Sequence, residues 1–243
     1  MKRTLLMRLA APLQSWGAHS RFSHRDTACE PTKSGVIGLV GAALGMRRDD
    51  RTTLARLAAL RFGVRVDREG QPLTDYHTVG GGTVGGSRYG VATARGGTAG
   101  TVLSHRECLM DADFLVGLEG SDAGFLEQLD RGLADPVWPL YLGRRCFPPG
   151  VPPRIGLVAA ELEAALAAWP WTARWGAGTF PEPGLRLVVE TDDPSGELRF
   201  DSPLSFALHQ RTYGPRRVLT RFLTAADLCC KELGGCPISP ASC

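Results

Sequence analysis

Hydrophobic and polar positions recur along this chain with two periods: short or alternating apolar runs that predict β-strands, and apolar residues three or four apart that predict amphipathic helices. The predicted strands span residues 4–10, 61–68, 73–79, 185–191 and 197–208, and the ordered stretch at residues 101–118 has a strand core at residues 115–118. The predicted helices span residues 52–60, 122–133 and 158–169, the second with Asp122 as its cap, and another begins within residues 31–45. In residues 61–68 apolar side chains alternate with arginines, so we expect this strand to bury one face only. The pattern as a whole predicts a mixed α+β fold.

The order of these elements predicts how the N-terminal part is built. Strand, helices, strand, hairpin, strand, helix and a last strand follow the split βαβ order of a ferredoxin-like fold. We therefore expect a ferredoxin-like, RRM-like domain at residues 1–149, a type of sheet that often binds RNA. Prolines at residues 148–153 predict a boundary to a smaller, mostly β part at residues 150–226. Residues 227–243 lack hydrophobic density and are expected to form a flexible tail.

Residues 31–45 read PTKSGVIGLVGAALG and predict a loop that leads into a helix. Thr32 or Ser34 can cap the first turn, and the free N–H groups there, with Lys33 beside them, predict a site for a phosphate. Each helical glycine is about 1 kcal/mol less stable than alanine, so we expect the four spaced glycines to face a closely packed sheet. A nucleotide-triphosphate loop is disfavoured because no glycine-rich run precedes TKSG. A helix cap without a ligand stays open.

Residues 80–100 are the most unusual stretch, since nine of these twenty-one residues are glycine. Residues 76–106 contain no acidic side chain. We interpret the stretch as a glycine-rich β-hairpin thumb at about residues 80–104, inserted in the N-terminal domain and ordered when an anionic partner arrives. A simple flexible linker is the alternative.

Composition and charge narrow the classes of function. The 243 residues are 43% hydrophobic, enough for a core, and no apolar run is long enough to cross a membrane. We expect a cytoplasmic protein without a membrane partner. Residues 1–65 carry twelve Lys or Arg against four Asp or Glu, a net +8, while the whole chain carries +3. This asymmetry predicts one face for an anionic partner.

The chain has seven cysteines, of which four lie after residue 228, and none forms a CxxC pair. No histidine accompanies the C-terminal cluster, so reduced thiols are favoured over a zinc site. No metal or other cofactor is expected.

Several motifs together resemble a known family. They are RLAAPLQSWG at 8–17, PTKSGVIGLVGAALG at 31–45, RDD at 48–50, DYHTV at 75–79, RE at 106–107 with DA at 111–112, and YLGRR at 141–145. In this order and spacing the chain resembles the CasD family, the crRNA-handle subunits of the type I-E CRISPR surveillance complex Cascade. The resemblance covers residues 4–149, and residues 203–218 are similar to the closing strands of the family.

The resemblance implies a non-catalytic subunit that binds the 5′ handle of a mature crRNA and caps one end of the complex in antiviral defence. Its implied partners are the crRNA handle, the backbone and large subunits of Cascade and, through the complex, the target DNA. The glycine-rich hairpin falls where the family has a thumb that contacts the neighbouring backbone subunit and the RNA. This hairpin has more glycine and less charge than the family pattern, and the cysteine-containing tail has no counterpart in it.

A single-stranded handle calls for phosphate contacts, stacking and base-edge hydrogen bonds. Lys33 and Ser34 are candidates for phosphate contacts, and Trp16, Tyr76 and Tyr89 for stacking, although Trp16 folded back on the core is an alternative. The complete set of candidate RNA-binding residues is Gln14, Trp16, Arg25, Lys33, Ser34, Tyr76, His77, Arg88, Tyr89, Arg106, Arg144 and Arg145.

Two other functions stay open. Metal-independent cleavage of CRISPR repeat RNA needs a general base and a general acid, for which the candidates are Tyr76, His77, His105 and Lys33. A structural adaptor without RNA contact is the second alternative, and the basic N-terminal half argues against it. The resemblance favours a binding protein, because a separate subunit cuts the RNA in that subtype.

Overall fold

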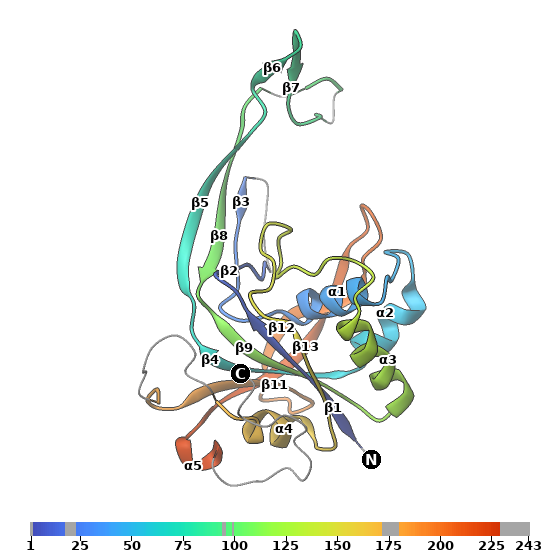
Figure 1. Ribbon diagram of the computed structural model, residues 1–243, viewed down its shortest axis with the longest axis vertical. Coiled ribbons are helices and arrows are strands. Elements are labelled where there is room, and N and C mark those ends of the chain that lie inside the picture. Colours follow the sequence, from blue (N-terminus) through green and yellow to red (C-terminus); the bar gives the residue numbers. More distant parts are fainter. Residues whose placement is uncertain (1, 18–22, 94–95, 99, 172–179, 229–243) are drawn as a thin grey trace.

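The computed structural model describes residues 2–17, 23–93, 96–98, 100–171 and 180–228. Within these ranges the chain has a mixed α+β fold with a mostly antiparallel sheet, as the sequence pattern predicts. The largest sheet has seven strands in the order β10-β1-β9-β4-β11-β13-β12 (Figure 1). Its strands are β1 Arg3–Ala10, β4 Arg61–Arg68, β9 Asp113–Gly120, β10 Arg154–Val158, β11 Leu185–Thr191, β12 Glu197–Ser205 and β13 Thr212–Leu223.

Helices cover both faces of this sheet, with α1, α2 and α3 on one side and α4 on the other (Figure 1). Side chains alternate along β1, so that Leu5 and Met7 belong to the core below α1–α3 and Leu6 belongs to the core below α4. The helices are α1 Lys33–Ala43, α2 Arg51–Ala58, α3 Ala123–Ala134, α4 Leu162–Ala168 and α5 Ala225–Leu228. The predicted caps are confirmed, since Thr32 and Asp122 accept hydrogen bonds from Gly35 N and Phe125 N.

A two-stranded ribbon projects from the body of the molecule (Figure 1). It pairs β5 Gln71–Val79 with β8 Val102–Met110, and β6 Gly82–Val84 pairs with β7 Ser87–Tyr89 near its tip. The short strands β2 Leu13–Gln14 and β3 His24–Arg25 join β8 near its base. The predicted hairpin at residues 80–104 is therefore present but longer, because the strands that flank it pair with each other and leave the main sheet.

The main sheet continues across the predicted boundary at residues 148–153. β10 follows those prolines and pairs with β1, while β11 pairs with β4. The strands of residues 150–226 therefore belong to the same sheet as the N-terminal part. The helix predicted at residues 158–169 begins only at Leu162, since Val158 ends β10. Most of the predicted tail, residues 229–243, lies outside the described residues.

β4 buries both faces, in contrast to the prediction of one. Arg65 has an exposed fraction of 0%, and its guanidinium forms an ion pair with Asp67 at 2.6 Å. Its Nη1 donates to the carbonyls of Leu166 and Trp169, each at 2.6 Å. These partners lie in and just after α4, about a hundred residues further along the chain, so the alternation within β4 alone could not reveal them.

Replacing Arg65 by alanine should lower the free energy of unfolding by about 3–5 kcal/mol, because Asp67 would stay buried without its partner. Urea unfolding measures this loss, and the exposed Arg3–Glu127 pair provides the control, since Arg3→Ala should lose less than about 1 kcal/mol.

Burial raises the pKa of Asp67 from its ordinary 3.8, and Arg65 opposes that rise. The folded variant would bind this proton more tightly than the unfolded chain, so stability should fall as the pH rises above 3.8. If Arg65→Ala and Arg3→Ala lost the same free energy of unfolding, this role of Arg65 would be contradicted.

Candidate nucleic-acid interface

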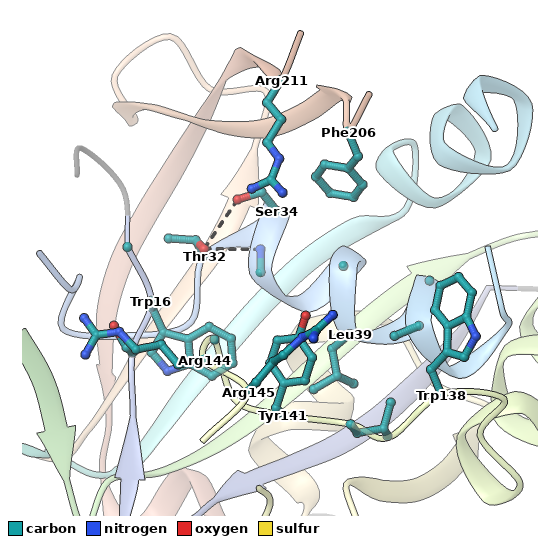
Figure 2. A pocket seen from close by; sticks show the side chains of 18 of the residues that line it. Trp16, Thr32, Ser34, Leu39, Trp138, Tyr141, Arg144, Arg145, Phe206 and Arg211 are labelled. Carbon is teal, nitrogen blue, oxygen red and sulfur yellow. Dashed lines mark hydrogen bonds between the residues drawn. The ribbon is translucent and has the colours of Figure 1, made fainter. Parts of the chain in front are cut away.

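A pocket of about 1290 Å³ lies over one face of α1. One wall comes from the segment at residues 138–148, and the opposite wall comes from the turn between β12 and β13. Figure 2 shows Tyr141, Arg145 and Trp138 on one side of α1, with Phe206 and Arg211 on the other. The base of the ribbon closes one end through Arg25 and Arg106. The pocket thus gathers segments from almost the whole length of the chain.

Arginine dominates the charge of this pocket. Its arginines are Arg25, Arg48, Arg106, Arg144, Arg145 and Arg211. Among the described residues that line it, Asp26 is the one acidic side chain. An excess of guanidinium groups in a concave surface attracts anions, and phosphate groups above all, because the planar fork matches their oxygens.

Arg144 is held in place by the backbone. Its Nη2 donates to the carbonyl of Glu107 at 2.7 Å and to that of Arg25 at 3.4 Å. Its Nη1 is buried and has no hydrogen-bond partner among the described residues. Burial lowers the pKa of Arg144, and the charge of Arg106 adds to this effect, yet an arginine stays protonated at neutral pH. A buried charged N–H calls for an acceptor, and within the described residues none is supplied.

A glycine allows the segment that carries Arg144 to lie against the end of β2. Ser15 N donates to the carbonyl of Leu142 at 3.1 Å, and Gly143 has a φ of +88°. A Cβ atom on Gly143 would lie 1.6 Å from the carbonyl oxygen of Ser15. A side chain at this position would therefore displace the segment and both of its arginines.

The glycines of α1 face the pocket, which corrects the expectation that they pack against the sheet. Gly35, Gly38 and Gly41 line the pocket, while Val36 and Val40 are buried in the core. The larger apolar residues bury more surface when they face the sheet, and this orients the helix. The glycine face of α1 then forms the floor of the pocket.

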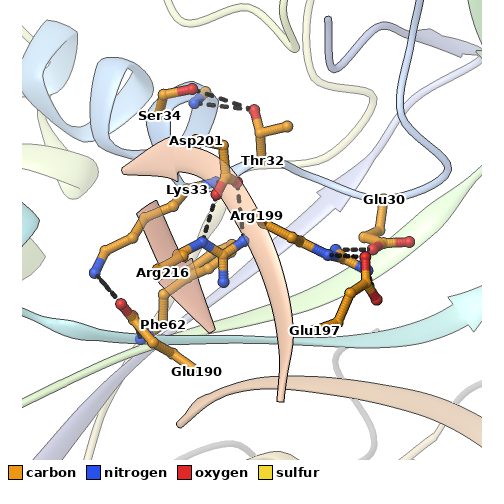
Figure 3. Close-up of polar contacts among 11 residues, drawn as sticks. Glu30, Thr32, Lys33, Ser34, Phe62, Glu190, Glu197, Arg199, Asp201 and Arg216 are labelled. Atoms are coloured by element: carbon orange, nitrogen blue, oxygen red, sulfur yellow. Dashed lines mark hydrogen bonds and ion pairs between the residues drawn. The ribbon is translucent and has the colours of Figure 1, made fainter. Parts of the chain in front are cut away.

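The predicted phosphate site at the N-terminus of α1 holds a carboxylate of the chain itself (Figure 3). Asp201 Oδ2 accepts a hydrogen bond from Lys33 N at 2.8 Å, and Arg216 binds the same carboxylate. The side chain of Lys33 is buried, and its Nζ donates to both oxygens of Glu190, at 2.9 and 2.8 Å. Burial lowers the pKa of Lys33, while Glu190 opposes that shift. The structure therefore offers Ser34 to a ligand in the pocket but does not offer Lys33.

Gln14 and Trp16 are also buried and bonded within the protein. The amide nitrogen of Gln14 donates to the carbonyls of Leu9 and Ala112, at 3.0 and 2.7 Å, and its oxygen accepts from the Trp16 indole at 3.1 Å. Trp16 is 2% exposed and lies beside Gly35, so it follows the alternative of a ring folded back on the core. Trp16 lines the pocket and Gln14 does not, and both side chains are too buried to offer much surface for stacking.

The ribbon divides its candidate residues between two faces, because consecutive residues of a strand point in opposite directions. Asp75 lies opposite Arg106 in the register, and Tyr76 lies opposite His105. Tyr76 therefore faces away from Arg106 and His77, and its ring lies edge-on to His105 with 5.4 Å between centroids. Tyr89 and Arg88 belong to β7, near the far end of the ribbon.

The structure thus brings together one half of the candidate residues. Those that line the pocket are Trp16, Arg25, Ser34, Arg106, Arg144 and Arg145. Those that do not line it are Gln14, Lys33, Tyr76, His77 and Tyr89, while the side chain of Arg88 lies outside what the structure describes. Sequence reasoning missed Arg48, Trp138, Tyr141, Phe206, Arg211 and Tyr213. Arg48 and Tyr141 stood in the family motifs, whereas only the folded chain brings the turn at residues 206–213 to α1.

Within the described ranges, no three His, Cys, Asp or Glu side chains gather closely enough to hold a metal ion. None of the described helices is both long and apolar enough to span a membrane. Cys29, Cys108 and Cys146 are free thiols, and the four C-terminal cysteines lie outside the described residues.

Comparison with known proteins relates this architecture to CRISPR systems. A family model described as CRISPR-associated protein (Cas_Cas5) matches residues 4–219. Over 164 residues the chain is 35% identical to the CRISPR system Cascade subunit CasD of Escherichia coli (strain K12). This match covers 61% of this chain and 68% of CasD.

Two solved structures agree with this relationship. A structure described as the crystal structure of a Cas protein is 39% identical with a TM-score of 0.69, and the match covers 93% of this chain and 97% of that one. A chain of a CRISPR RNA-guided surveillance complex is 36% identical with a TM-score of 0.75, and the match covers 90% of this chain and 89% of that one. The protein whose pocket is described above therefore belongs to the CRISPR-associated Cas5 family.

Proposed function

We propose that this chain is the crRNA-binding subunit of a Cascade surveillance complex and that its arginine-lined pocket holds the 5′ handle of the crRNA. The observation that carries the proposal is the buried Nη1 of Arg144, which has no acceptor among the described residues and lies in a pocket with six arginines and one acid. The identity with CasD, a Cascade subunit, supports it. The likeness to a chain of an RNA-guided complex supports it as well.

The pocket suits a single strand with exposed phosphates. Arg106 and Arg144 line the pocket, and so does Ser34 at the start of α1. Arg48 and Arg211 add further positive charge to it. A sugar–phosphate chain that follows these groups exchanges its counterions for guanidinium groups, which favours binding at low salt.

We infer that the N-terminal strands form a ferredoxin-like unit. In chain order β1, β4, β9 and β10 are its first to fourth strands, and they lie in the order fourth, first, third, second. The ribbon is inserted between the second and third. RRM domains bind RNA on the open face of such a sheet, but here α4 covers that face. The RNA therefore lies beside α1 in our proposal.

The remaining partners follow from the same assignment. We assign the ribbon to the neighbouring backbone subunit and the RNA, and its exposed Val84 and Tyr89 favour such a contact. The large subunit would adjoin the same end of the complex, and target DNA would be met only through the complex. Such an assembly would act in the cytoplasm.

We infer that the subunit is not a nuclease. Tyr76 and His77 point to opposite faces of the ribbon, and Lys33 is bound to Glu190 in the interior. His105 does meet Tyr76, with 5.4 Å between ring centroids, but neither residue lines the arginine-lined pocket. The four candidate groups therefore do not gather around one phosphodiester in that pocket.

Changing Arg144 to glutamate should reduce the crRNA content of complexes about tenfold or more, because it removes a charge-assisted contact of about 1.5–3 kcal/mol and adds repulsion. The complexes would be purified after co-expression with the other subunits and a crRNA, and the extracted RNA quantified. The exposed Arg131 on α3 provides the matched control, since Arg131→Glu makes the same change of charge away from the pocket. With purified subunit and handle RNA, Arg144→Ala should also reduce the salt slope by about 1. Unchanged RNA content in folded Arg144→Glu complexes would favour the structural adaptor.

Changing Gly143 to alanine should weaken handle binding about fivefold or more, although no charged group is removed. The added Cβ clashes with Ser15 and must shift Arg144, and non-glycine residues at positive φ are themselves strained. A filter-binding or anisotropy titration measures the loss. Gly124→Ala, at an exposed position of α3, should leave the affinity unchanged, and equal affinity of the two variants would contradict the placement of Arg144 by this glycine.

Purified protein incubated with CRISPR repeat RNA, with and without chelator, should leave the RNA intact. Denaturing gels provide the readout. Specific cleavage that His77→Ala or Tyr76→Phe abolishes would replace the binding function by the nuclease.

A further inference from the structure

Gly38 differs from the other glycines on the pocket floor. A Cβ atom on Gly35 would lie 2.9 Å from the ring of Trp16, and one on Gly41 would lie 2.7 Å from the terminal methyl group of Met46. Each of these glycines therefore makes room for a neighbour within the chain. A Cβ atom on Gly38 would meet no heavy atom within 4 Å. Glycine weakens a helix interior, so its presence needs a reason. No neighbour among the described residues requires a glycine at position 38.

The pocket that Gly38 lines also has apolar and aromatic walls. Leu39 follows Gly38 on the helix, and Figure 2 shows Tyr141 and Trp138 on one side of α1 with Phe206 on the other. Backbone contact fixes the first wall, because Trp138 N donates to the carbonyl of Ala42 in α1 at 3.3 Å. Six arginines line the same pocket.

This combination fits one component of a single-stranded RNA. A nucleobase has flat apolar faces that stack on aromatic side chains, and it is joined to phosphates that require cations close by. An aliphatic side chain of a partner protein would fit the apolar walls but would not account for six arginines in the same pocket.

We propose that one nucleobase of the bound RNA lies directly against the backbone of α1 at Gly38, between Tyr141 and Phe206. This inference rests on the proposed function and adds to it a position that determines how closely the RNA approaches. Glycine at position 38 keeps the helix surface flat, and any side chain there would occupy the space of the base.

The first test replaces Gly38 by alanine and by leucine in the full-length chain, assembled with the other subunits and a crRNA. Both residues favour helix, so the melting midpoint of the free subunit should stay the same or rise by about 2 °C. RNA affinity should fall about threefold for alanine and tenfold or more for leucine. Gly124→Ala is the matched control, since its Cβ would meet only Asp122 Oδ1, at 3.7 Å, and it should bind as the wild type does.

The second test identifies the base. Handle RNAs with one abasic nucleotide at each position in turn are titrated against the wild type and Gly38→Leu. The wild type should lose affinity at several positions, and at one of them Gly38→Leu should lose nothing further, because the same contact is already absent. Fully additive losses at every position would overturn the proposal.

The outcomes separate this inference from the function on which it rests. If Arg144→Glu loses the RNA and Gly38→Leu binds it as the wild type does, the base contact is wrong and the function stands. If neither variant affects RNA binding, the proposed function fails. If Gly38→Leu keeps its RNA but no longer assembles with the other subunits, a partner side chain occupies the space and the proposal is overturned.

Discussion

The pocket depends on how the N-terminus of α1 is held, and a carboxylate from the other end of the chain holds it. Asp201 Oδ2 accepts the hydrogen bond of Lys33 N, and Arg216 binds both oxygens of the same group. Burial alone would raise the pKa of Asp201, but the bonds from Arg216 and the Lys33 N–H outweigh it and lower the pKa. This stabilisation is therefore present at neutral pH and is lost as the pH falls through the lowered pKa. A negative charge at a helix N-terminus also interacts favourably with the helix dipole.

The same contact explains why the C-terminal strands belong to the site. Lys33 Nζ binds Glu190 of β11, and Glu30, just before α1, pairs with Arg186 and Arg199 of β11 and β12. These bonds fix α1 on the main sheet with its glycine face toward the pocket. Beyond Asp201, the turn after β12 supplies Arg211 to the opposite wall. A chain without its last strands would therefore lose both a wall of the pocket and the support of its floor.

Local signals in the sequence predicted the elements well, because the forces that define them act over a few residues. Thr32 caps α1 and Asp122 caps α3 as expected, and the strand at residues 61–68 is present. Glu190, which binds Lys33, and Leu166, whose carbonyl binds Arg65, lie more than a hundred residues away from them, and no period in the sequence encodes such distances. Alternation shows which side chains share a face of a strand, but which element covers that face depends on the whole topology.

The residues of the site divide in the same way, into those that local motifs predict and those whose role depends on the whole fold. Arg106, Arg144 and Arg145 were predicted because they stand in the family motifs and a guanidinium can bridge phosphates or bases. Lys33 was assigned to a phosphate because a helix N-terminus attracts anions, and that physical argument was sound. It missed that the protein supplies the anion itself, as Asp201, and that information lies in β12. The glycine face was misplaced for a related reason, because only the competition between Val36, Val40 and the glycines for the sheet decides it.

The arginines of the pocket then act in two different ways. Arg25 and Arg145 are exposed, so their charges are screened by salt and attract an anion over a distance of about one Debye length. Arg144 is oriented beforehand by two carbonyl groups, and it loses less conformational freedom when a ligand binds. Attraction and positioning are thus assigned to different side chains. A bound strand would be drawn in by the exposed arginines, but its register along α1 would be set where Arg144 and the helix surface leave least freedom.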